Sequence, residues 1–417
     1  MRIKDFIRFF MMNSRSGSIM KPFPQHIKYT TGTIKPNYIN QKKIDQQVKD
    51  FYEIWKSKYL KKNSMKPNQY YINSNIEGML EPKNVVSISE SHGHGMLLTV
   101  IMANIDDSSE KLYFDGLYRF YKDHSSNNND LLMAWKQVED ENGNIINYES
   151  STDKPDSATD GDMDIAYSLL LAHYQWGSDG EINYLNEAKR MIQEIMLSDV
   201  HSIDFFLKLG DWVSNDNSKY GRGTRPSDFM MDHLKAFQKE TGDSRWIQVI
   251  NKTYIITDQI YNSNTGLLPD FAEKQNGKFK PVREGYLEGE YDGYYFTNAC
   301  RTPWRLSLDY LLTGDKRALP LLNQLNRWIR TKTNNNPNKI KTGYYLDGRD
   351  LSNSSENDLA FISPFAVSAM VNDENQEWLN MLWKKMISIN FNTGRYYGNS
   401  IKLLCMVVIS NNWWFPE

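Results

Sequence analysis

A glutamate and two histidines stand close together in the segment SESHGHG, residues 89–95. His92 and His94 are two positions apart, so they could bind one metal ion only from an extended or looped backbone, and a catalytic zinc needs a third protein ligand. The other histidines show no matching pair spacing. Alternatively, Glu90 lies on a glycine-rich loop before a helix that begins near Met96, and serves there as a general acid. A solvated loop glutamate is the ordinary explanation for such a residue, so the choice depends on the rest of the chain.

Three aspartates, Asp160, Asp162 and Asp164, open the segment TDGDMDIAYSLLLAHYQW, residues 159–176. Carboxylates in a first helical turn are explained simply by their favourable interaction with a helix N-terminus. The rest of this helix is apolar on most sides, however, which indicates an inner, buried helix. Carboxylates at the end of a buried helix tend to face a cavity, so we expect a functional cleft here.

A third segment, REGYLEGEYDGYYFTNACRTPWR at 283–305, interleaves carboxylates with tyrosines and glycines. The helix that follows opens at Asn298 and carries Arg301 and Arg305. The acidic part could be an ordinary exposed loop. Acidic and aromatic side chains together also describe the wall of a groove that binds a polyhydroxy or cationic chain. The carboxylates are Glu284, Glu288, Glu290 and Asp292.

The elements that must position these residues are helices spread over nearly the whole chain. Strand-like alternation is rare, and KETGDSRW (239–246) and LLTGDKRA (311–318) each end one helix at Thr-Gly and start the next after Asp. Such tight reversals join antiparallel helix pairs, so we predict an all-α fold of helix hairpins. Helical spacing covers about 43–60, 95–104, 109–122, 162–176, 183–197, 226–240, 244–261, 298–312, 316–331, 374–388 and 399–410.

The overall composition excludes several classes of protein. A formal net charge of −2 over 417 residues, without a basic block, argues against a nucleic-acid partner. No apolar run approaches the ~18 residues of a membrane span, so no membrane partner is expected. Cys300 and Cys405 lie in apolar helical patterns and are predicted to be buried free thiols. Residues 1–19 are predicted to be an extension without a clear signal peptide, and 20–417 a single domain.

The three chemistry-bearing segments together resemble glycoside hydrolase family 8. The segment ATDGDMDIAYSLLLAHYQW (158–176) is similar to the signature of that family, and further similarity lies in SESHGHGMLLTV (89–100), LLMAWK (131–136), TRPSDFMMDHLKAF (224–237), GLLPDF (266–271) and NACRTPWR (298–305). The resemblance is nearest to the Bacillus-type chitosanases and mixed-linkage glucanases. It implies an (α/α)6 barrel and an inverting endo-β-1,4-glycanase that needs no metal or organic cofactor.

The resemblance also implies roles for individual carboxylates. Glu90 corresponds to the proton donor, and Asp160 to the aspartate that holds the sugar and orders the water. Many family members carry their base, an aspartate, where this chain has Asn298, and an amide cannot take a proton at neutral pH. In the chitosanase-like branch a glutamate in the preceding loop serves instead, which points to Glu288. Glu290 is the close rival, and Glu284 a distant one.

Further residues are expected to line the substrate groove. Trp135 is a candidate stacking platform for a sugar ring, with core packing as the equal alternative. Arg301 is expected to orient Asp160 or a sugar hydroxyl, with a structural ion pair as the alternative. The remaining candidates for substrate binding are Asp162, His94, Asn298 and Glu290.

The expected substrate is a polysaccharide. Chitosan is favoured because the acidic run near Glu288 would attract its protonated amines, and mixed-linkage β-glucan or a cellulose-like chain is the alternative. From another class, a carbohydrate-binding protein that has lost catalysis is the main competitor, and a metallohydrolase using His92 and His94 is the third. By resemblance the protein is expected to be secreted, and a monomer is the default.

Overall fold

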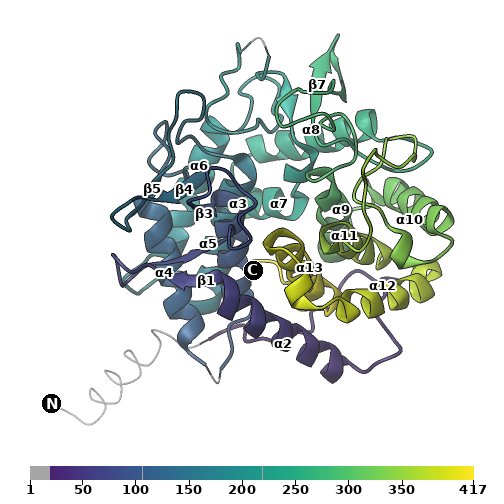
Figure 1. Ribbon diagram of the computed structural model, residues 1–417, viewed down its shortest axis with the longest axis horizontal. Coiled ribbons are helices and arrows are strands. Elements are labelled where there is room, and N and C mark those ends of the chain that lie inside the picture. The colour runs from purple at the N-terminus through teal and green to yellow at the C-terminus, as the bar shows by residue number, and fades with distance from the viewer. Residues whose placement is uncertain (1–18, 106, 218) are drawn as a thin grey trace.

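The helices of this protein form two concentric rings. The computed structural model describes residues 19–105, 107–217 and 219–417. The inner ring consists of α3 (Ser89–Ile101), α5 (Thr159–Trp176), α7 (Met231–Thr241), α9 (Thr302–Thr313), α11 (Leu359–Ala369) and α13 (Tyr396–Ile409). Each packs against an outer helix, in the same order α4 (Ser109–Asp123), α6 (Tyr184–Ser198), α8 (Arg245–Ile260), α10 (Leu319–Thr333), α12 (Gln376–Ser388) and α2 (Gln41–Tyr59) (Figure 1).

Burial explains which helices lie inside. Every residue of α11 is buried, and so is every residue of α5 except His173 and Tyr174. Outer helices bury one face only, as α2 does with apolar residues spaced from Ile44 to Tyr59. Each inner helix contacts its two neighbours, and α13 contacts α3, so the ring closes. The predicted all-α (α/α)6 barrel is therefore confirmed.

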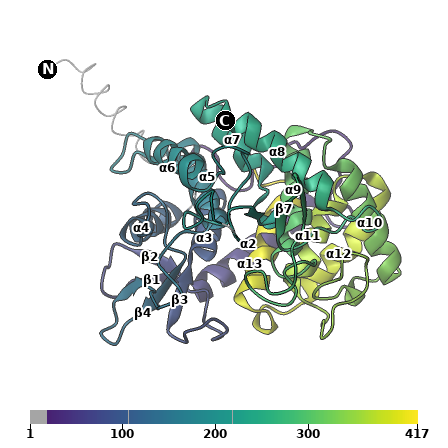
Figure 2. The ribbon, with the colours of Figure 1, turned by 90° about the horizontal axis from the view of Figure 1, so that it is seen from above.

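Short antiparallel strands occupy the connections. In Figure 2, strands β1 to β4 lie at one side of the barrel, next to α3 and α4. The strands are β1 (Leu60–Lys62) with β2 (Tyr70–Ile72), then β3 (Val85–Ile88), β4 (Lys136–Glu139) and β5 (Ile145–Asn147), then β6 (Gly223–Thr224), β7 (Ala272–Gln275) and β8 (Lys278–Pro281). Single 3-10 turns are η1 (Pro226–Asp228), η2 (Ala299–Arg301), η3 (Pro337–Lys339), η4 (Asp373–Asn375) and η5 (Phe391–Thr393).

Two features of the helices differ from expectation. Helix α11 was not expected, because its sequence is apolar without a 3.6-residue period and contains Pro364. The segment 89–95, expected as a loop before a helix near Met96, is instead the first part of α3. The glycines that suggested a loop serve close packing: a Cβ at Gly93 would lie 2.7 Å from the Cβ of Asp164.

Other local expectations are met. Gly242 and Gly314 follow α7 and α9 in the left-handed conformation, as the Thr-Gly reversals predicted. Cys300 and Cys405 are buried and free. The extension expected over residues 1–19 falls, except for Ile19, outside the described residues. Within the described part of the chain, each helix is too short or too polar to cross a membrane.

Residues 20–34 run across the C-terminal ends of five inner helices. These ends carry carbonyl groups that lack a partner within their own helix. The backbone N–H groups of the segment donate to some of these carbonyls or to those just beyond. The pairs are Met20 to Gln175 (2.9 Å), Phe23 to Ala103 (2.7 Å), Ile27 to Asn411 (2.6 Å), Thr30 to Leu311 (2.8 Å) and Ile34 to Met370 (2.9 Å). We call residues 20–34 the closing segment.

Gly161 provides a test of how closely α3 and α5 pack. A Cβ at this position would lie 2.6 Å from the Cβ and 2.7 Å from the backbone carbon of Ser89, so one helix would have to move. We expect Gly161→Ala to lower the free energy of unfolding by about 1–3 kcal/mol, as overpacking does. The matched control is Gly180→Ala, where a Cβ would meet open space. Equal denaturation midpoints for both variants would contradict the close approach.

Candidate active site

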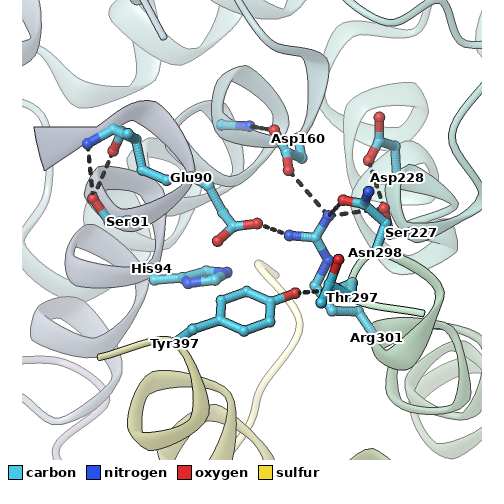
Figure 3. Close-up of polar contacts among 12 residues, drawn as sticks. Glu90, Ser91, His94, Asp160, Ser227, Asp228, Thr297, Asn298, Arg301 and Tyr397 are labelled. Atoms are coloured by element: carbon cyan, nitrogen blue, oxygen red, sulfur yellow. Dashed lines mark hydrogen bonds and ion pairs between the residues drawn. The ribbon is translucent and has the colours of Figure 1, made fainter. Parts of the chain in front are cut away.

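The first turns of four inner elements converge at one end of the barrel (Figure 3). Glu90 comes from α3, Asp160 from α5, Arg301 from η2, and Tyr397 from α13. Glu90 is the only residue of α3 that is not buried, and Tyr397 is the only such residue of α13. Both line a cavity of about 920 Å³ that also includes Asn298. Helices α3 and α13 therefore present Glu90 and Tyr397 at a cavity, while their remaining turns build the core.

Arg301 links two of the predicted carboxylates. Its guanidinium is in direct contact with the carboxylate of Glu90, and its Nη2 lies 3.2 Å from Oδ2 of Asp160. The same nitrogen donates to Ser227 Oγ at 2.8 Å. The side chain of Arg301 is only 1% exposed, so its charge is held where water cannot screen it. The sequence suggested either a contact of Arg301 with Asp160 or a structural ion pair. One guanidinium makes both of these contacts.

The contact with Arg301 also bears on the role predicted for Glu90. A proton donor has to be neutral before it acts. A neighbouring guanidinium favours the ionised carboxylate instead. The contact as it stands therefore does not favour the neutral form that the predicted role of Glu90 needs.

Asp160 is buried, with 4% of its surface exposed. Its Oδ1 accepts the backbone N–H of Gly161 at 2.8 Å. Burial raises the pKa of its carboxyl, and the guanidinium of Arg225, 3.9 Å away, acts in the opposite direction. Held between two arginines at a helix start, Asp160 is suited to fix the position of a ligand.

Glu288 lies on a loop that is anchored by two buried residues. The carboxylate of Asp292 accepts three backbone N–H groups from this loop, at 2.7 Å from Leu287, 3.0 Å from Glu288 and 2.9 Å from Gly289. Tyr286 packs in a small apolar cluster, and its hydroxyl donates to the carbonyl of Lys219 at 3.3 Å. These contacts fix the backbone of Glu288 although its side chain is 44% exposed.

Both carboxylate oxygens of Glu288 accept hydrogen bonds from neighbouring side chains. Arg225 Nη2 donates to Oε1 at 3.1 Å, and Asn298 Nδ2 donates to Oε2 at 2.8 Å. Asn298 Oδ1 in turn lies 3.3 Å from Arg301 Nη2. The two rivals face elsewhere: Glu290 is exposed beside Tyr291, and Glu284 accepts from Tyr294 at 3.1 Å.

Sequence reasoning did not assign Asp270, which holds the backbone beneath Asn298. Its carboxylate accepts the N–H groups of Phe296 (3.0 Å), Asn298 (3.2 Å) and Ala299 (2.6 Å). Burial raises the pKa of Asp270 to about 8, although these donors act in the opposite direction. Asp270 lies in GLLPDF, one of the segments that carry the resemblance, and this position could have marked it as a candidate.

Arg225 was also missed. It follows β6 directly, is 9% exposed, and its guanidinium lies 5.2 Å from the ring centre of Phe271. Burial by itself lowers its pKa, but the carboxylates of Asp228, Glu288 and Asp160 outweigh burial and raise it. The arginine of TRPSDF was visible in the sequence, but nothing there showed that it is buried or which acids it meets.

Three predicted groove residues have other surroundings. Trp135 is half-buried, and its Nε1 donates to Asp153 at 2.9 Å while the Lys136 ammonium lies 4.0 Å from its ring centre. Asp162 is fully buried and accepts the N–H of Met133 at 2.9 Å. Burial raises its pKa well above the usual range, and nearby Asp199 adds to the shift. The contact of Asp162 with substrate is a prediction that this position does not favour.

His94 is fully buried, 3.6 Å from Asp164, and burial lowers its pKa to about 4. A direct contact with substrate is a prediction that its position does not favour either. His92 points to another neighbour, the carbonyl of Leu117, at 2.9 Å. Among the described residues there is no group of three or more His, Cys, Asp or Glu that could hold a metal ion.

Several known proteins are similar to this chain over nearly its whole length. The family described as Glycosyl hydrolases family 8 matches residues 23–411. A beta-glucanase of Niallia circulans is 50% identical over 397 residues, which cover 94% of this chain and 91% of the relative. An endoglucanase of Bacillus sp. (strain KSM-330) is 39% identical, covering 95% and 82%. The apo structure of a β-1,3-1,4-glucanase from Paenibacillus sp. X4 superposes with a TM-score of 0.87 at 49% identity, covering 95% and 100%.

The chain therefore belongs to glycoside hydrolase family 8. As a member of this family it is an inverting enzyme that hydrolyses O-glycosyl bonds. The resemblance noted in the sequence is confirmed. The comparisons support the alternative of a glucanase better than chitosan hydrolysis, which was the first expectation.

Proposed function

We propose that the protein is an endo-glucanase that cleaves β-1,4 bonds in mixed-linkage β-1,3-1,4-glucan. Glu90 is the general acid, Glu288 is the general base, and Asp160 positions the sugar and the water. The observation that carries this proposal is a continuous line of contacts from Glu90 through Arg301 and Asn298 to Glu288. The relatives named beta-glucanase and β-1,3-1,4-glucanase support the choice of glucan.

The line of contacts suits inversion. An inverting enzyme places its two carboxyl groups about 6.5–9.5 Å apart, so that a water molecule fits between the base and the sugar. Arg301 and Asn298 separate Glu90 from Glu288, which supports such a spacing. Glu90 donates its proton to the leaving oxygen while Glu288 takes a proton from the attacking water. Afterwards Glu288 is protonated and Glu90 is ionised, and exchange with solvent restores both.

The charges of the loop that carries Glu288 support a neutral substrate. Chitosan was favoured because the run of carboxylates would attract its amines. Asp292 is buried and bonded to its own loop, and Glu288 is paired with Arg225. The loop thus presents less uncompensated negative charge than its sequence suggests, and attraction of a polycation is correspondingly weaker.

A substrate panel tests the choice of polymer. We expect release of reducing ends from barley β-glucan to exceed release from chitosan, carboxymethyl cellulose and xylan by about tenfold or more in kcat/KM. Chitosan should be assayed at low and high salt, because salt screens exposed charge pairs. A rate on chitosan that exceeds the rate on β-glucan and falls with added salt would return the choice to chitosan.

We further propose that the enzyme acts outside the cell. A glucan chain is too large to enter a cell intact. Activity on added polymer in the culture medium of the native host, measured without lysis, tests this location.

A further inference from the structure

Arg225 is a buried group that links the loop of Glu288 to the barrel. Its Nη2 donates to Glu288 Oε1 at 3.1 Å, and its Nη1 lies 3.9 Å from Oδ2 of Asp160. These acids come from different parts of the fold: Glu288 lies on a loop, and Asp160 lies at the start of α5. One guanidinium therefore touches the carboxylate of the base and approaches the carboxylate that positions the substrate.

The backbone of Arg225 is fixed on both sides. The preceding residues form β6, which pairs with β7 in the register Gly223 to Glu273 and Thr224 to Ala272. The following residue, Pro226, opens η1, and the carbonyl of Arg225 accepts the N–H of Asp228 at 3.0 Å. The guanidinium therefore projects from a rigid part of the barrel, whereas Glu288 projects from a loop.

We propose that Arg225 is a positioning residue that orients the carboxylate of Glu288, and this inference rests on the proposed role of Glu288 as the base. Asn298 holds the other oxygen but is neutral, so Arg225 supplies the charge. A planar guanidinium fixes an acceptor in direction as well as in distance. The negative groups around this arginine and its partner are Asp160, Asp228, Asp270 and Asp292.

The first test compares Arg225→Ala, Arg225→Lys and the control Arg190→Ala on β-glucan. Arg190 pairs with Glu187 on the surface of outer helix α6. We expect Arg225→Ala to lower kcat by about 10²-fold, as misplacement of a reacting group does, with KM changed much less. Arg225→Lys should recover part of kcat, because lysine restores the positive charge but lacks the planar donor geometry of the guanidinium. This variant also keeps the test valid if the alanine variant does not fold. Free guanidinium should also raise the rate of Arg225→Ala.

A double variant separates positioning from a structural role. Adding Arg225→Ala to Glu288→Gln should cause no further loss, because the residue through which Arg225 acts is already absent.

The outcomes distinguish this inference from the proposed function. If Glu288→Gln is inactive but Arg225→Ala has the kcat of Arg190→Ala, only the role of Arg225 is wrong. A further large loss in the double variant also overturns it. If Glu288→Gln is fully active, the assignment of the base fails and the role of Arg225 fails with it.

Discussion

Glu90→Gln is expected to lower kcat on β-glucan by about 10³- to 10⁴-fold, which is the upper part of the range that general acid catalysis contributes. Glutamine keeps the size of the side chain but has no proton to give to the leaving oxygen. The measurement is release of reducing ends from barley β-glucan. The matched control is Glu53→Gln on the surface of α2, where the same change should leave kcat at the wild-type value.

A second substrate makes the test of Glu90 specific for proton donation. A 2,4-dinitrophenyl cello-oligosaccharide has a leaving group that departs without protonation. We expect the loss in Glu90→Gln to be much smaller for this substrate than for β-glucan. An equal loss on both would show that Glu90 acts in another way. Sugar binding without hydrolysis by the wild-type protein would favour the non-catalytic alternative.

Glu288→Gln is expected to lower kcat by about 10²- to 10⁴-fold, whereas Glu290→Gln should stay near wild type. The reason is geometric, because Glu288 is bonded to Arg225 and Asn298 while Glu290 is exposed beside Tyr291. The two glutamates are two positions apart in one loop, so Glu290→Gln is a closely matched control. Both are assayed on β-glucan, with KM determined separately from kcat.

The reverse result for these two variants would move the base from Glu288 to Glu290. An active enzyme in both single variants but not in the double variant would mean that either carboxylate can serve. Thermal unfolding of each variant shows whether a loss of activity reflects loss of the fold. Neither side chain contributes to the core, so we expect equal midpoints.

Much of the fold could be predicted because the spacing of apolar residues reflects which side of a helix is buried. The outer helices carry apolar residues on one face and polar residues on the other, with a helical period. Helix α5 is apolar on most sides between its aspartates and Trp176. Helix α11 has no such period, since every one of its residues is buried and Pro364 lies inside it. The glycines in 89–95 led to the wrong prediction of a loop. Glycine favours turns in loops, but in a buried helix it also permits close contact between backbones.

The candidate site could be predicted less completely than the fold. Glu90, Asp160 and Glu288 lie in segments whose residue types suggest chemistry, and the structure brings them to one region. The roles of Arg225 and Asp270 depend on contacts between residues far apart in the chain, such as the donation from Asn298 N–H to Asp270. Spacing within a segment carries no information about such partners.

The closing segment also constrains the order in which the protein folds. Its N–H groups bond to carbonyls near the ends of α3, α5, α9, α11 and α13, and Asn411 follows the last helix of the chain. During synthesis these residues leave the ribosome before all of the residues that accept their hydrogen bonds. The cost of closing such long loops is met only when the partner helices have formed. The closing segment therefore docks late, after the inner helices whose carbonyls it bonds have formed.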